Sequence, residues 1–90
     1  MKQLFKYECK EVSNKLMKVI ITDLVHGEIL EVDTDISHVS KKLLPDVLAM
    51  FESPMEELSY GLYGDTITSD LVQDIFKDAV KASKQQSKEK

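Results

Sequence analysis

The sequence predicts an α+β fold in which an antiparallel sheet of about three strands packs against two or three helices. Apolar residues alternate with polar ones over residues 3–34 and recur at helical spacing from residue 36 onward. The chain has 90 residues, of which 42% are hydrophobic, which is the size and composition of one small core. We therefore expect a single domain over residues 1–83, followed by a disordered polar tail over residues 84–90.

The first strand is expected close to the start of the chain, where Phe5, Tyr7 and Cys9 alternate with charged residues. The polar residues 13–15 supply a turn, and the segment 16–25 is rich in apolar and β-branched residues, which is typical of a second strand. This pattern favours Cys9 as a small core residue rather than a reactive thiolate.

The turn at residues 13–15 is predicted to have an odd length, with Asn14 in the left-handed region of backbone space. An odd length places Tyr7 beside Ile21. An even length would instead turn the apolar residues of the first strand to the face of the second strand that carries both polar and apolar residues. The first two strands should therefore share one apolar face.

A second hairpin is expected at His26-Gly27, because glycine supplies the positive φ that a two-residue loop requires. This loop would pair Ile21 with Val32 and would fix the register of the third strand. The residues that it gathers on the apolar face are Val19, Ile21, Val25, Leu30 and Val32.

Helical segments follow the sheet. Apolar residues keep helical spacing over residues 36–51, straight through Pro45, which predicts a kinked helix or two abutting helices. A short helix over residues 54–63 is predicted from Ser53 as its N-cap, a proline at its first position and Gly64 as its stop.

The last helix is predicted to begin near Ser69, which is a suitable N-cap. Its apolar residues form one stripe, and its charged residues form the opposite face. The residues of the stripe are Leu71, Val72, Ile75, Phe76, Ala79 and Val80.

The charge of the chain disfavours nucleic acid as a partner. Twelve lysines stand against sixteen acidic residues, for a net charge of -4, and there is no arginine. A net negative protein repels a phosphate backbone, and lysine lacks the planar fork with which arginine reads phosphate or guanine. No apolar run approaches the roughly 18 residues that a membrane-spanning helix needs, so we expect a cytoplasmic protein.

Residues for catalysis or metal binding are not apparent. Cys9 is the only cysteine, and its surroundings lack the spacing of a zinc site. Glu31, Asp33 and Asp35 alternate along the third strand, where successive side chains of one face lie about 6–7 Å apart and face solvent. We therefore expect a non-enzymatic protein with no metal and no cofactor.

Aromatic and methionine side chains gather in the middle of the chain, and such side chains are enriched at protein interfaces. Tyr60 and Tyr63 fall outside the apolar stripe of the predicted short helix, which indicates a contact surface formed with Met50 and Met55. The sequence thus favours a protein-binding module, such as a regulator or inhibitor carried by a phage or mobile element.

Two further expectations concern the partner. A chain this small buries a limited share of its surface, so association with a second copy as a homodimer would add stability. The alternative function is a nucleic-acid-associated accessory factor that uses Lys41, Lys42 and the basic tail.

Overall fold

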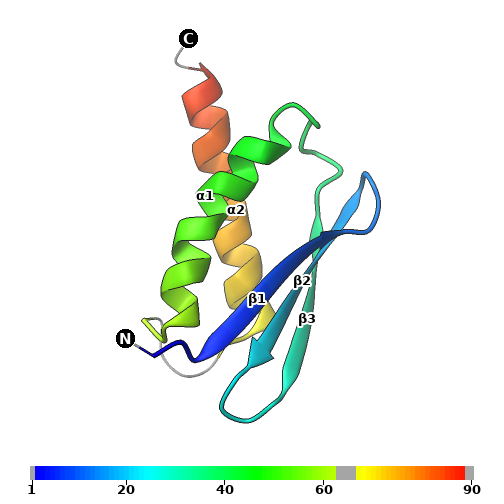
Figure 1. Ribbon diagram of the computed structural model, residues 1–90. Coiled ribbons are helices and arrows are strands. Elements are labelled where there is room, and N and C mark those ends of the chain that lie inside the picture. The colour runs from blue at the N-terminus through cyan, green and yellow to red at the C-terminus, as the bar shows by residue number, and fades with distance from the viewer. Residues whose placement is uncertain (1, 63–66, 89–90) are drawn as a thin grey trace.

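The computed structural model describes residues 2–62 and 67–88 and shows three antiparallel strands followed by two helices (Figure 1). The strands lie in the order β1-β2-β3, and the helices cover one face of the sheet, with α1 beside β1 and α2 beside β3. This arrangement confirms the predicted α+β class, with two helices. The elements are β1 (Phe5–Glu11), β2 (Leu16–Asp23), β3 (Ile29–Asp35), α1 (Leu44–Ser59) and α2 (Ser69–Lys88).

The register of the first hairpin agrees with the prediction. Tyr7 pairs with Ile21 and Cys9 pairs with Val19, so the apolar residues of both strands share the face that the helices cover. We call this the inner face of the sheet. The turn between the strands spans residues 13–15 and has the odd length that this register requires.

The predicted left-handed conformation of Asn14 is wrong, because no non-glycine residue in the described part of the chain has a positive φ. The turn is closed instead by Ser13, whose Oγ accepts a hydrogen bond from the backbone N–H of Lys15 at 3.2 Å. A serine side chain that mimics a backbone turn in this way removes the need for a left-handed residue.

The loop of the second hairpin is longer than predicted. It comprises residues 24–27 rather than two residues, so Ile21 pairs with Leu30 and not with Val32. A carboxylate determines this difference, because Asp23 Oδ1 accepts hydrogen bonds from the backbone N–H groups of Val25 at 2.8 Å and His26 at 2.9 Å.

The shift in register amounts to two residues, and side chains alternate with a period of two, so every strand residue keeps its predicted face. Val19, Ile21 and Val32 are buried on the inner face as expected. Val25 is the exception, because the longer loop removes it from the sheet and leaves it 64% exposed.

Gly27 adopts the positive φ that the sequence predicts, at 74°, and a Cβ atom built there would have nothing within 4 Å. Replacing Gly27 by valine should therefore lower the free energy of unfolding by about 1 kcal/mol or more, through backbone strain alone. Gly27→Asn should cost less, because asparagine tolerates this conformation. Denaturant unfolding of both variants tests the loop, and equal stability of the valine and asparagine forms would contradict it.

Helix α1 corrects the predicted short helix over residues 54–63, because it runs without interruption across Ser53 and Pro54. Pro54 lacks the N–H of a helical bond, which ordinarily costs about 3 kcal/mol. The helix continues because Phe51, Met55 and Leu58 are buried on one side of it, and their packing outweighs the lost bond.

The ends of α1 also differ from the sequence-based expectation. The helix ends at Ser59 with Tyr60 as its C-cap, and Gly61 follows with a φ of 79°. The predicted stop, Gly64, lies outside the described residues. At the other end, Pro45 lies in the first turn, where its missing N–H is not needed. The apolar residues Ile36 and Val39 are buried in turns that precede the helix.

Helix α2 carries the predicted stripe, in which Val72, Ile75 and Phe76 are buried. Its cap is Thr68 rather than Ser69, because Thr68 Oγ1 accepts a hydrogen bond from the backbone N–H of Leu71 at 3.2 Å. The helix continues to Lys88, through most of the segment that we expected to be a disordered tail.

Burial of β1 decreases along the strand. Phe5 is buried, Tyr7 is half-buried and Cys9 is exposed, so the expectation that Cys9 belongs to the core is wrong. The reason lies in the position of α1, which is held at the start of β1 by a hydrogen bond from Leu4 N–H to the carbonyl of Ser59 at 2.8 Å. The C-terminal half of β1 is therefore an open edge of the inner face.

Candidate protein-interaction surface

A shallow hollow of about 320 Å³ lies at the C-terminal end of α1. We call it the α1 hollow. Tyr60, predicted as a contact residue, is half-buried at this hollow, and Leu62 is 61% exposed beside it. The residues of the hollow are Ser53, Glu56, Glu57, Tyr60 and Leu62.

Leu62 is exposed because of where α1 ends. The helix ends before Leu62, and the positive φ of Gly61 turns the chain away from the core, so this side chain reaches the surface. The glycine was the signal in the sequence that could have indicated its exposure.

The other residues predicted for the contact surface are placed differently. Met55 is 0% exposed and belongs to the core, so its side chain packs on the buried side of α1. Met50 is partly buried and packs against the core. Tyr63 lies outside the described residues. Of the three predicted residues that the structure describes, Tyr60 is the one that borders the α1 hollow.

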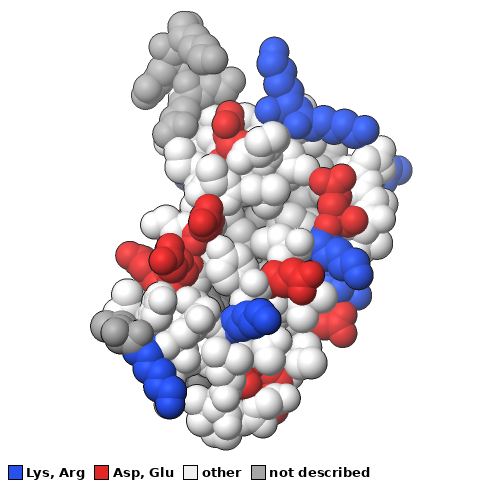
Figure 2. Space-filling model, viewed as in Figure 1, with Lys and Arg blue, Asp and Glu red and all other residues white. Residues whose placement is uncertain are grey.

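The exposed side of α1 is acidic. The helix contains four carboxylates and no basic residue, and Figure 2 shows the carboxylate side chains gathered over it. Glu56 and Glu57 border the α1 hollow directly. The hollow therefore combines an aromatic and an aliphatic side chain with a negatively charged rim, a composition that complements a basic protein surface.

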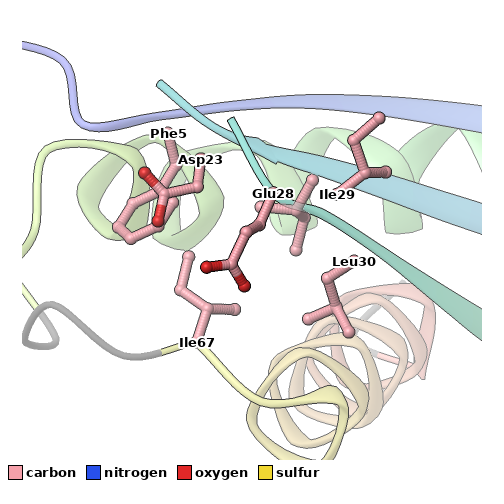
Figure 3. A pocket seen from close by; sticks show the side chains of 7 residues that line it. Phe5, Asp23, Glu28, Ile29, Leu30 and Ile67 are labelled. Atoms are coloured by element: carbon pink, nitrogen blue, oxygen red, sulfur yellow. The ribbon is translucent and has the colours of Figure 1, made fainter. Parts of the chain in front are cut away.

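A second hollow, of about 300 Å³, lies at the hairpin end of the sheet. Figure 3 shows the carboxylates of Asp23 and Glu28 beside the apolar side chains of Phe5, Leu30 and Ile67. Hydrogen bonds from His26 and from the backbone N–H of Val25 lower the pKa of Asp23, and its Oδ2 lies 2.9 Å from His26 Nδ1. The carboxylate of Asp23 is thus ionised and engaged in holding the loop.

Acidic residues of β3 line a third hollow of about 300 Å³ with His38 and Lys77. Hydrogen bonds from Ser37 lower the pKa of Asp35 in this region.

On the outer face of the sheet, the Nζ of Lys18 lies 3.1 Å from a carboxylate oxygen of Glu31, and this contact raises the pKa of Lys18. In the part of the chain that the structure describes, no three His, Cys, Asp or Glu side chains are close enough to hold a metal ion.

The lysines named for the alternative function, Lys41 and Lys42, are exposed in the turns that precede α1. Neither borders one of the three hollows described above. An acidic residue, Asp46, follows them in the first turn of the helix.

Within residues 2–62 and 67–88, no helix is long and apolar enough to cross a membrane. No protein-family model, curated protein or solved structure matches the chain.

Proposed function

We propose that this protein is a non-enzymatic binding module that docks a partner protein on the α1 hollow and acts as a regulator or inhibitor. The observation that carries the proposal is that Tyr60 and the exposed Leu62 line the same hollow, which Glu56 and Glu57 border. Interfaces place aromatic and aliphatic side chains at the centre and polar ones at the rim. A stable interface buries about 800 Å² on each partner, so the hollow would form its centre.

The charge of α1 indicates the kind of partner. Carboxylates on one helix attract a basic surface and accelerate encounter with it. Two copies of α1 that face one another would bring like charges together, so we propose a different protein as the partner at this surface. We place the complex in the cytoplasm, because Cys9 is a free thiol exposed at the surface.

Replacing Tyr60 and Leu62 by serine together tests the proposal. The melting temperature should change little, because Leu62 is exposed and Tyr60 is only half-buried, whereas partner capture should fall sharply, because central aromatics dominate binding energy. Quantitative affinity capture from the native host, beside a thermal melt, measures both effects. The matched control is Val12→Ser, which removes an aliphatic side chain that is 55% exposed at the first hairpin.

An unchanged set of captured proteins from the folded double variant would show that the α1 hollow is not the docking surface. The alternative function predicts another outcome, because a nucleic-acid factor would lose its associated proteins on nuclease treatment or on charge reversal of Lys41 and Lys42. Both arms use the same capture experiment and give distinct results.

A further inference from the structure

The outer edge of β1 presents unpaired backbone groups. Hydrogen bonds from Leu24 N–H to Leu4 C=O at 2.9 Å and from Val12 N–H to Leu16 C=O at 3.0 Å show that the even-numbered residues bond to β2. In an antiparallel pair the intervening residues then point their N–H and C=O groups away from the partner strand. Those of Phe5, Tyr7, Cys9 and Glu11 point outward, and none of them bonds to another described residue.

The opposite edge of the sheet is less available. The side chain of Gln73 on α2 donates a hydrogen bond to the outward carbonyl of Asp33 on β3 at 3.2 Å. The β3 edge is therefore partly covered by α2, whereas lysine and glutamate side chains alternate along the open β1 edge (Figure 2). Of the two edges, β1 is the one to which an additional strand could bond.

Helix α1 packs against β1 and carries the carboxylates of Glu52 and Glu56. Tyr7 on β1 is half-buried and packs against the core, and burial, followed by the charges of Glu52, Cys9 and Glu56, raises the pKa of its phenol. A strand added next to β1 would direct every second side chain towards these carboxylates. Its inward positions would therefore favour lysine or arginine, whose aliphatic stems can pack on Tyr7 while their charged ends reach the glutamates.

We infer that the β1 edge binds an extended basic segment of the partner protein. This segment adds to the sheet as a fourth strand, hydrogen-bonded to β1, with Lys or Arg side chains facing α1. This inference rests on the proposed binding function and specifies how the partner is held. Main-chain hydrogen bonds would provide affinity, and the charges of Glu52 and Glu56 would select the side chains. Glu56 also borders the α1 hollow, so a single partner can cover both features.

A second copy of the chain fits this edge less well. Two-fold pairing of β1 with itself would place both α1 helices on the same side of the joined sheet. Glu52 and Glu56 of both copies would then face one another across the axis, with no basic residue on either helix to separate them. The charges therefore favour a basic partner over self-association.

The test uses the full chain, labelled with ¹⁵N, and the peptide Lys-Thr-Lys-Val-Lys-Thr-Lys as the probe. The peptide should shift the amide signals of Tyr7, Cys9 and Glu11 and slow their hydrogen exchange by about tenfold or more, because these amides gain acceptors. The amides of Lys6 and Glu8, which alternate with them along the strand, should change less. A peptide with glutamate in place of every lysine is the control and should have no effect.

Two variants with matched controls separate the backbone from the charges. Cys9→Pro removes an outward N–H without breaking a bond to β2, and it should weaken peptide binding by about tenfold, whereas Cys9→Thr should not. Glu52→Lys should weaken binding by a similar factor. Asp74→Lys, an equal charge change at an exposed position of α2, should have a smaller effect. The Glu52 variant keeps the test decisive if the proline variant fails to fold.

Equal binding of the glutamate peptide, protection at β3 instead of β1, or full binding by both Cys9→Pro and Glu52→Lys would overturn the inference. So would a dimer in sedimentation that Cys9→Pro dissociates, because the occupant would then be a second copy. Capture from the host distinguishes this failure from that of the proposed function. If the Tyr60 and Leu62 variant loses the partner and Cys9→Pro does not, the α1 hollow is a docking surface and the β1 edge is not. If only Cys9→Pro loses the partner, the edge is a docking surface and the hollow is not.

Discussion

Replacing Phe76 by alanine is expected to lower the free energy of unfolding by about 3–5 kcal/mol, which is a large share of the stability of a small domain. Phe76 is 3% exposed, and its ring meets that of Phe51 edge to face, with centroids 5.5 Å apart and planes at 79°. The pair joins α2 to α1, so truncation leaves a cavity between the helices and removes the aromatic contact.

Denaturant unfolding measures this effect, with Lys77→Ala as the control, because Lys77 is the exposed neighbour of Phe76 on the same helix. The control should change the free energy of unfolding by less than about 0.5 kcal/mol. Phe76→Leu should fall between the two, because it retains much of the buried volume. A Phe76→Ala protein as stable as the Lys77 control would show that the contact between the helices is not part of the core.

Replacing Met55 by alanine should cost about 2–5 kcal/mol, because this side chain is 0% exposed beneath α1. Met50→Ala is the matched control, since the same atoms are removed from a side chain that is only partly buried. Its effect should be clearly smaller. The comparison separates support of the fold from contact with a partner, which the sequence alone had assigned to both methionines.

Thermal melts and partner capture should be recorded for both methionine variants. If Met55→Ala retained the stability of the Met50 control and yet lost the partner, Met55 would be an interface residue rather than a core residue. Loss of stability with capture intact in the fraction that remains folded would agree with the structure.

The candidate surface was only partly predictable from the sequence. Tyr60 could be identified because it departs from the helical stripe, whereas Met55 could not be distinguished from a surface residue without the true start of the helix. The exposure of Leu62 depends on where α1 ends, and the open β1 edge depends on the position of α1 above Phe5 and Tyr7. Both are properties of packing between elements, which residue periodicity does not report.

The sequence by itself determined the class of fold, the face that each strand buries and the stripe of α2, because side-chain periods of 2 and about 3.6 allow only one apolar side for each element. The tertiary structure decided the rest. The carboxylate of Asp23 lengthened the second hairpin, and burial of Phe51 and Met55 carried α1 through Pro54. For α1, packing that forms only in the folded chain outweighed the cost of about 3 kcal/mol that proline imposes inside a helix, whereas the second hairpin followed a local turn that the Asp23 side chain forms with its own loop. The periodic pattern therefore indicated the elements but not their limits.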